Sequence, residues 1–265
     1  MATSSATAVY PLEFYPSENL LEEDYLPESD GKPMAETDLH RLLMIYLLIA
    51  LEEYFRKDPQ VYVSGNIFVY YRDESKLRKS ICPDIFVVRG VKKKDRRVYN
   101  LDVERKAPEV VIELTSSETK TEDFGNKRFI YASLGVKEYF LYDPYNETIK
   151  PALRGFRLKN GDYMPMVGTR LRSEVLGLEL RLEEGRLRLY DPKTGEYLRT
   201  HEESEAERRR LGKRVAQELR AKQKVQAKLA AAEAKAATLE AENARLLAEL
   251  AKLRRNGNSR KNGKN

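Results

Sequence analysis

Three charged side chains stand in or directly beside segments that are otherwise apolar. Asp84 opens an apolar run, Glu113 interrupts a second run, and Lys127 follows in a predicted helix. A carboxylate within an apolar strand costs free energy unless it is paired or binds a metal ion. These three residues are therefore the first candidates for chemistry.

Two carboxylates at neighbouring strand ends would offer the hard oxygen ligands that Mg²⁺ prefers, with water in the remaining coordination positions. Such an ion polarises a phosphodiester and promotes attack by water, and a nearby lysine orients that water and stabilises the charge on phosphorus. Each residue also has a simpler interpretation: Asp84 as a turn or cap residue, Glu113 as a partner of Lys127 without a metal ion, and Lys127 as a solvated helix residue. Their order on consecutive elements favours a shared site.

The elements that must position these residues follow from the hydrophobic pattern. A wide apolar stripe predicts a helix over residues 38–56 that is buried along much of its surface. Apolar and β-branched runs predict four strands, and a helix that stops at Gly135 precedes the last of them. The strands are 61–71 (broken at Gly65-Asn66), 81–88, Val110–Leu114 and Glu138–Tyr142, and the second helix is 121–134. This α-β-β-β-α-β order predicts an α/β fold with a mixed sheet covered on both faces.

The rest of the chain before residue 200 is less regular. Residues 1–33 predict an irregular arm, and residues 153–199 predict β-hairpins that turn at Asn160-Gly161 and Glu184-Gly185. All eight Phe and all sixteen Tyr precede residue 200, so the material for a core lies there.

The C-terminal part differs in composition. From His201 onward, 17 Lys and Arg accompany 9 Asp and Glu, against 31 and 33 before it, so the basic charge belongs to the tail. Residues 200–255 keep a heptad repeat with Asn243 at an a position, which predicts a two-stranded parallel coiled coil, and residues 256–265 predict a disordered basic tail. The a positions are Val215, Lys222, Leu229, Ala236, Asn243 and Leu250, and the d positions are Leu211, Glu218, Val225, Ala232, Leu239, Leu246 and Leu253.

The counts of cysteine and histidine exclude several kinds of site. Cys82 is the only cysteine, and His40 and His201 are the only histidines, which argues against a disulfide framework, a cysteine-rich zinc site and a histidine metal cluster. His40 is expected to serve helix packing or capping. No signal peptide is evident, and the longest apolar stretch, residues 42–51, is about half the length of a membrane span. We therefore expect a cytoplasmic protein with no membrane partner.

The segments around the candidate site resemble a known family. They are CPDIFVV (residues 82–88) and APEVVIELTSSETKTEDFGNKRFIYASLGVKEYFLYDP (residues 107–144). They are similar to the Uma-type (Uma-two) family of restriction-endonuclease-like proteins, which has a Pro-Asp before an apolar strand, a Glu in a second strand, and then Asp, Lys and Tyr at four-residue intervals. The matching residues are Asp84, Pro108, Glu113, Thr115 or Ser116, Asp123, Lys127, Tyr131, Gly135 to Tyr139 and Asp143-Pro144. The resemblance extends more loosely from the helix with His40 to the hairpins near Tyr190.

The resemblance implies a nuclease of the PD-(D/E)xK superfamily. Residues 34–199 would form a restriction-endonuclease-like core that hydrolyses DNA phosphodiester bonds with Mg²⁺ or Mn²⁺. Asp84 and Glu113 would bind the metal ion, and Lys127 would act on the attacking water. Glu36, just before the first helix, is a candidate for a further metal ligand.

The chain departs from the superfamily pattern at one position. The acidic-x-Lys motif would place a lysine at position 115, where this chain has Thr115. The family resemblance implies that the lysine has moved to the following helix, as Lys127. If Lys127 did not reach the site, the protein would bind DNA without cutting it.

The remaining expectations concern partners. The loop between the second and third strands carries basic residues that are candidates for phosphate contacts, with a solvated loop as the alternative: Lys92, Lys93, Lys94, Arg96 and Arg97. Cutting both DNA strands requires two sites, so we expect a homodimer through the globular domain, the coiled coil or both. A catalytically silent nuclease fold that binds DNA and a coiled-coil scaffold are the alternatives, and the intact set of Asp84, Glu113 and Lys127 favours the nuclease.

Overall fold

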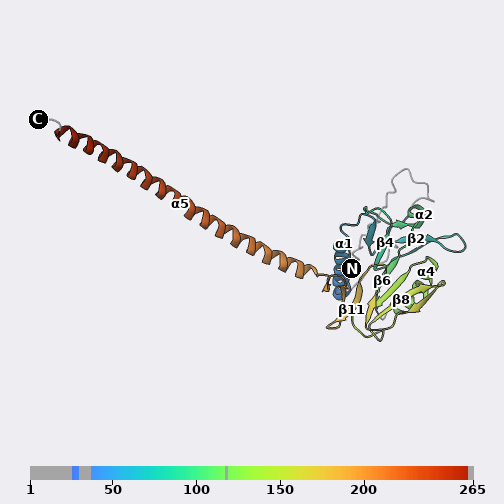
Figure 1. The fold of residues 1–265 in the computed structure, drawn as a ribbon. Helices are drawn as coiled ribbons and strands as arrows, with labels where there is room; N and C mark the ends of the chain where they lie inside the picture. The colour runs from blue at the N-terminus through green and yellow to red at the C-terminus, as the bar shows by residue number, and fades with distance from the viewer. Residues whose placement is uncertain (1–25, 30–36, 117–118, 262–265) are drawn as a thin grey trace, which may run out of the picture. The chain divides into compact units, whose positions relative to one another are not determined.

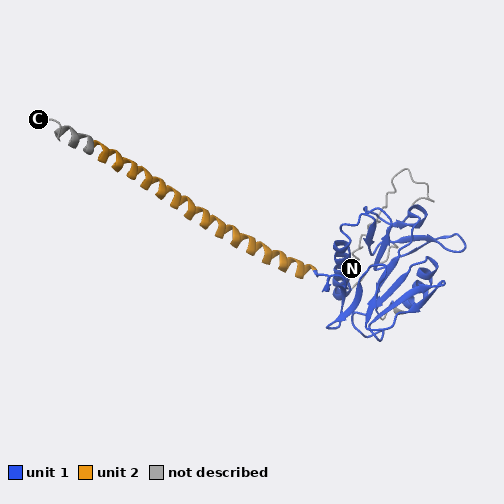
Figure 2. Cartoon of the chain, viewed as in Figure 1, with its two compact units in different colours: residues 1–200 blue, residues 201–265 orange. Residues whose placement is uncertain are grey.

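The computed structural model describes residues 26–29, 37–116 and 119–261, whose fold is shown in Figure 1. The chain forms two compact units, residues 1–200 and residues 201–265 (Figure 2). Of the predicted N-terminal arm, residues 26–29 form neither helix nor strand. Glu36 lies outside the described residues.

A six-stranded mixed sheet forms the centre of the first unit. Its strand order is β1-β4-β6-β7-β8-β9, in which β6 and β7 are parallel and the other neighbours are antiparallel. The strands are β1 Val61–Ser64, β4 Ile85–Arg89, β6 Val110–Leu114, β7 Glu138–Tyr142, β8 Leu153–Lys159 and β9 Asp162–Pro165. This confirms the mixed α/β class.

Both faces of this sheet are covered. Along β4, Ile85 and Val87 pack into one apolar cluster, whereas Phe86 and Val88 pack into another. The first cluster includes the buried side of helix α1 (Asp38–Tyr54), and the second includes Tyr131 of helix α4 (Arg128–Ser133). A strand with apolar side chains on both faces needs such cover.

Two smaller sheets complete the first unit. The order β3-β2-β5 joins β3 Arg78–Ile81, β2 Val69–Arg72 and β5 Tyr99–Asn100. The order β10-β11-β12-β13 joins Arg170–Arg172, Glu179–Glu183, Arg186–Asp191 and Glu196–Tyr197. The short helices are α2 Leu101–Glu104, α3 Lys120–Glu122 and a π-helix, η1, Asp123–Lys127.

The predicted hairpin turns are confirmed. Asn160-Gly161 joins β8 to β9 with φ of 51° and 85°, and Glu184-Gly185 joins β11 to β12 with φ of 48° and 77°. Two consecutive left-handed residues are the geometry that favours Asn-Gly in short hairpins.

The segment 61–81 differs from its prediction. Residues 61–71 form two strands in different sheets, because the chain turns at Gly65-Asn66, where Asn66 is left-handed (φ 54°). The sequence does not predict β3, since Arg78, Lys79 and Ser80 are polar and exposed. β3 pairs with β2 as a hairpin.

The prediction that the first helix is buried along much of its surface was wrong. Leu43, Leu47 and Leu51 are buried, but Leu42 is 60% exposed, and Ile45 and Ile49 are each 42% exposed. The helix therefore packs on one side only. None of the described residues of the first unit covers the other side.

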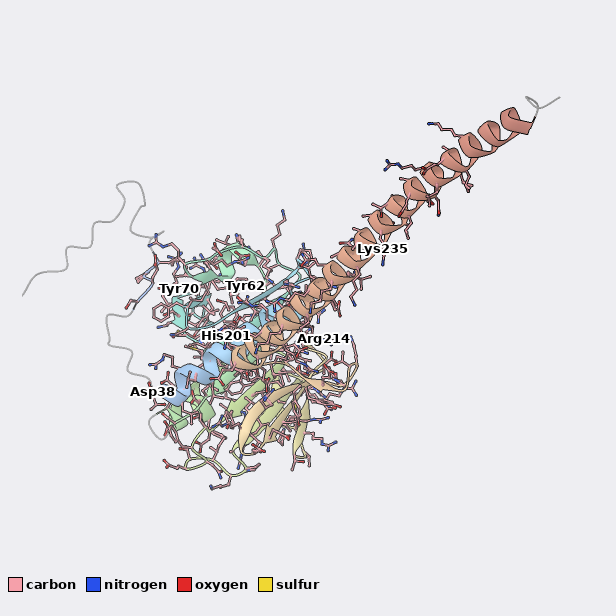
Figure 3. The ribbon with its side chains drawn as sticks, turned by 90° about the vertical axis from the view of Figure 1, so that its left-hand side faces the viewer. Asp38, Tyr62, Tyr70, His201, Arg214 and Lys235 are labelled. Atoms are coloured by element: carbon pink, nitrogen blue, oxygen red, sulfur yellow. The ribbon has the colours of Figure 1, made fainter. Side chains whose placement is uncertain are left out.

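The second unit is a single helix, α5 (His201–Lys261), which extends beyond residue 255 into the segment predicted to be disordered. Figure 3 shows its side chains, among them Arg214 and Lys235, both exposed. The apolar a and d side chains are also exposed, for example Val215 (64%) and Leu239 (52%). Of the helices that the structure describes, none combines the length and apolar character required to cross a membrane.

Candidate active site

The pairing of β4 with β6 brings the two predicted carboxylates together. Ile85 lies opposite Ile112 in this antiparallel pair, so Asp84 and Glu113 meet at its end. The backbone N–H of Asp84 donates to Oε2 of Glu113 (3.2 Å), and the N–H of Leu114 donates to Oδ2 of Asp84 (2.7 Å). The side chain of Glu113 is fully buried, whereas that of Asp84 is 19% exposed.

The backbone of Asp84 is supported from behind by the turn after β1. The N–H of Asn66 donates to the carbonyl of Pro83 (2.9 Å). A Cβ atom on Gly65 would lie 2.0 Å from the carbonyl oxygen of Asp84, a distance that no side chain tolerates. Position 65 therefore needs glycine for a close backbone approach.

Lys127 reaches the two strands from η1. Its Nζ lies 3.1 Å from Oε2 of Glu113 and 3.2 Å from Oδ1 of Asp123, and its side chain is only 13% exposed. π-Helical turns occur often at functional sites. The structure thus brings Asp84, Glu113 and Lys127 into one cluster.

Two tyrosines fix this cluster from the α4 side of the sheet. The Tyr131 hydroxyl donates to Oε1 of Glu113 (2.6 Å), and the Tyr139 hydroxyl donates to the backbone carbonyl of Asp123 (2.9 Å). Tyr131, Tyr139 and Asp123 match the family pattern in the sequence, but no role in the site was expected for them. Asp123, Lys127 and Tyr131 follow one another at four-residue intervals, a spacing that could have placed them on one helix face.

His40 also lies at the site. Its backbone N–H donates to the side chain of Thr37, which caps α1, while its Nε2 lies 3.6 Å from Oδ1 of Asp84. The expected capping role therefore describes only the backbone. The imidazole contacts the more exposed of the two carboxylates.

The electrostatics of the cluster are dominated by its carboxylates. Burial raises the pKa of Glu113 to about 8, the ammonium of Lys127 opposes this shift, and the carboxylates of Asp84 and Asp123 add to it. Burial also acts to raise the pKa of Asp84, but the nearby imidazole of His40 and the charge of Lys127 outweigh it, so that this pKa is lowered. Burial acts to lower the pKa of Lys127, but Glu113 and Asp123 outweigh it and raise the pKa. Three acidic groups share one ammonium, and an added cation would balance them.

This donor set fits a hard divalent cation. Asp84 and Glu113 offer neighbouring carboxylates in a negatively charged surrounding, and Mg²⁺ commonly binds one or two carboxylates while it keeps several waters. Among the described residues, no three His, Cys, Asp or Glu side chains are arranged to hold a metal ion alone. Water or phosphate oxygens would have to complete the coordination.

Position 115, where the superfamily motif would place a lysine, holds a buried threonine. Thr115 is 1% exposed, and its backbone N–H donates to the carbonyl of Tyr142 (2.8 Å). Two residues after Glu113, it projects to the same face of the sheet as Glu113. The ammonium of Lys127 reaches Glu113 on this side from the helix.

The structure does not bring the predicted DNA-contacting loop to this site. The loop follows β4, at the opposite end of the strand from Asp84. Arg96 is 4% exposed, is paired with Glu104 (2.8 Å) and stacks on Tyr62, so its role is structural. Lys94 also pairs with Glu104 (3.2 Å), and Arg97 pairs with Glu28. Lys92 and Lys93 are exposed.

Comparisons with known proteins give one family and one solved structure. The model of the Uma2 family, described as "Putative restriction endonuclease", matches residues 28–187, which contain the whole cluster. A solved structure described as "a putative nuclease belonging to DUF820" from Anabaena variabilis is 15% identical in sequence. That match covers 57% of this chain and 86% of that chain, with a TM-score of 0.41. The comparison with curated proteins found no match.

Proposed function

The chain belongs to the Uma2 family, and from this membership and the site we propose that it is a divalent-metal-dependent endonuclease that hydrolyses phosphodiester bonds in DNA. The observation that carries the proposal is the convergence of two neighbouring carboxylates, Asp84 and Glu113, with the buried ammonium of Lys127. Buried charges of this kind are expensive to maintain without a use for them.

Asp84 and Glu113 are the proposed ligands of Mg²⁺ or Mn²⁺. A bound divalent ion would polarise the phosphodiester and favour the deprotonation of an attacking water. Tyr131 engages Oε1 of Glu113, which directs Oε2 towards Asp84 and Lys127. His40 contacts Oδ1 of Asp84, while Oδ2 is fixed by the backbone of Leu114.

Lys127 acts as a charged donor in this proposal. Because its pKa is raised, the side chain stays an ammonium and cannot serve as the general base. Its N–H groups would orient the water and stabilise the negative charge that develops on the phosphate oxygens. Asp123 holds the ammonium from the other side.

The test is nicking of supercoiled plasmid with Mg²⁺, Mn²⁺ or a chelator. We expect metal-dependent nicking by the wild type and a loss of at least about 100-fold in Asp84→Asn and Glu113→Gln, because each loses a ligand charge at the transition state. Glu109→Gln is the matched control, since Glu109 lies just before the same strand and pairs with Lys137 (2.6 Å), outside the site. Near wild-type nicking by Asp84→Asn would refute the mechanism. DNA binding without nicking by the wild type would favour a catalytically silent DNA-binding protein.

We further propose that the chain acts as a homodimer through α5. The two strands of a duplex have opposite polarity, and a symmetric dimer presents one site to each. The exposed apolar side chains at the a and d positions of α5 supply a surface for a second copy. Lys92 and Lys93 stay candidates for DNA contact at the far end of β4.

A further inference from the structure

Among the described residues of the first unit, the β2–β3 hairpin has the longest run of exposed side chains. Its base is buried at Val69, Tyr71 and Ile81, but every described residue from Glu74 to Ser80 is exposed. β3 is an edge strand, paired with β2 on one side. In Figure 1 the loop of this hairpin extends outward beyond the β2 label. A polar strand with exposed side chains on both faces adds little to the core, so its side chains are available for a partner.

The composition of the hairpin suits a nucleic acid. Lys76, Arg78 and Lys79 are exposed cations, and Leu77 between them is 58% exposed. Proteins that enter a DNA groove combine cations for the phosphates with an apolar side chain placed against a base step. A two-stranded β-ribbon also has the width of the major groove.

Hydrogen bonds within the hairpin hold its turn in a defined conformation. The backbone N–H of Asp73 donates to the carbonyl of Leu77 (3.0 Å), and the N–H of Leu77 donates to Oδ1 of Asp73 (2.9 Å). Lys76 takes the left-handed conformation that closes the turn (φ 61°), and its carbonyl accepts from Arg72 (3.1 Å). Such preorganisation lowers the entropy lost on binding.

The hairpin also lies next to the proposed active site. β3 ends at Ile81, three residues before Asp84, so Lys79 is within about 17 Å of Asp84 along the chain. At the tip, Glu74 shares a hollow of about 440 Å³ with Phe124 and Arg128. These two residues flank Lys127 in η1 and α4, so the hairpin faces the helix that supplies the lysine.

We propose that the β2–β3 hairpin is an arm that binds double-stranded DNA beside the scissile phosphate. Lys76, Arg78 and Lys79 contact phosphates a few nucleotides from the cleavage position, and Leu77 packs into the groove between them. The assignment rests on the proposed function for the identity of the ligand. The proposed DNA-binding surface of the hairpin is separate from the carboxylate cluster.

The experiment measures binding apart from cleavage. The full chain, kept in chelator, is titrated into a fluorescently labelled duplex of about 25 base pairs at several salt concentrations. We expect Arg78→Ala/Lys79→Ala to weaken binding at least about 10-fold and to reduce the slope of log K against log salt by about 2, since each phosphate contact adds about 0.9. Leu77→Ser should weaken binding about 3- to 10-fold without a change in slope, because it removes no charge.

Arg170→Ala/Arg172→Ala is the matched control. It removes two exposed cations from β10 in the four-stranded sheet, and we expect a change in affinity below about 2-fold. An equal loss in both double variants, or no loss in Arg78→Ala/Lys79→Ala, would overturn the arm, as would an absence of duplex binding by the wild type. Thermal melting verifies that each variant is folded.

Plasmid nicking in Mg²⁺ separates this inference from the proposed function. If the wild type nicks plasmid but Arg78→Ala/Lys79→Ala binds as the wild type does, the arm is wrong and the nuclease stands. If the wild type binds DNA through the hairpin but never nicks it, the arm stands and the nuclease is wrong.

Discussion

At the scale of single residues, the carboxylate of Glu113 is the point where the contacts of the site meet. Oε1 accepts from Tyr131, and Oε2 faces both the backbone of Asp84 and the ammonium of Lys127. Removing one partner of a buried ion pair costs about 3–5 kcal/mol, because the other charge stays buried. A substitution that keeps the charge therefore complements the charge-removing variants.

Lys127→Arg is the substitution that separates charge from shape. The side chain keeps its charge, but a planar guanidinium does not fit where a compact ammonium lies 3.1 Å and 3.2 Å from two carboxylates. We expect turnover in plasmid nicking to fall at least about 100-fold, with DNA affinity in chelator changed less than about 2-fold. Lys137→Arg, at the exposed pair with Glu109, is the control. A matching loss of rate and affinity would instead identify Lys127 as a phosphate anchor.

Metal binding should be visible without any substrate. An ion that binds only the folded state at 100 times its Kd stabilises that state by about 2.7 kcal/mol. We expect Mg²⁺ or Mn²⁺ to raise the Tm of the wild type, measured by thermal melting, and Glu113→Gln to lose this shift while Glu109→Gln keeps it. The same shift in Glu113→Gln as in the wild type would show that the ion binds elsewhere.

At the scale of elements, the close approach of the β1–β2 turn to Asp84 can be tested at Gly65. Gly65→Ala would force backbone atoms apart, since its Cβ would meet the Asp84 carbonyl at 2.0 Å. Overpacking of this kind costs about 1–3 kcal/mol, and the displaced Asp84 should reduce nicking more than the lower stability explains. Urea unfolding and nicking below the unfolding transition measure the two effects.

Gly212→Ala is the control for Gly65→Ala, because nothing lies within 4 Å of the added methyl group on α5. Its nicking should match the wild type, and its stability should be equal or slightly higher, because alanine favours a helix more than glycine does. Full nicking activity in folded Gly65→Ala would mean that the position of Asp84 does not depend on this turn.

The elements that depend on local sequence were predictable. The apolar runs at β4, β6 and β7 predicted a sheet covered on both faces, and Asn160-Gly161 predicted the turn between β8 and β9. Both predictions depend only on residues that are neighbours in the sequence. The exposed side of α1 was not predictable in this way, because an apolar stripe does not show whether a partner covers it. The polar strand β3 owes its position to pairing with β2, which no local pattern records.

The same division applies to the site. The order of Asp84, Glu113 and Lys127 on consecutive elements was enough to group them, and the structure places them within hydrogen-bonding or ion-pair distance. Sequence reasoning missed His40, because its contact with Asp84 joins residues far apart in the chain. It also gave no role to Asp123, although the four-residue spacing from Lys127 could have placed both side chains on one helix face.

At the scale of the whole molecule, the homodimer proposal can be tested at two adjacent leucines of α5. Leu246 is a predicted d position and Leu247 is not, yet both are exposed, at 52% and 67%. A lysine in a coiled-coil seam is desolvated against its partner, whereas one beside the seam stays in water. We expect Leu246→Lys with Leu250→Lys to convert a dimer into a monomer in light scattering, and Leu247→Lys to leave the dimer intact. A monomeric wild type, or equal masses for all three proteins, would refute dimerisation through α5.

The π-helix η1 makes the site depend on the number of residues in this turn. A π-helical turn amounts to one extra residue within an α-helix, while the helix on either side keeps its direction. Deleting Gly125, beside which a Cβ would meet nothing within 4 Å, would convert the turn to α-helix and leave α4 with Tyr131 in place. The interval between Asp123 and Lys127 would then fall from four residues to three. Removing one residue from this turn would therefore alter the ion pair between Asp123 and the ammonium of Lys127 and would leave the sheet unchanged.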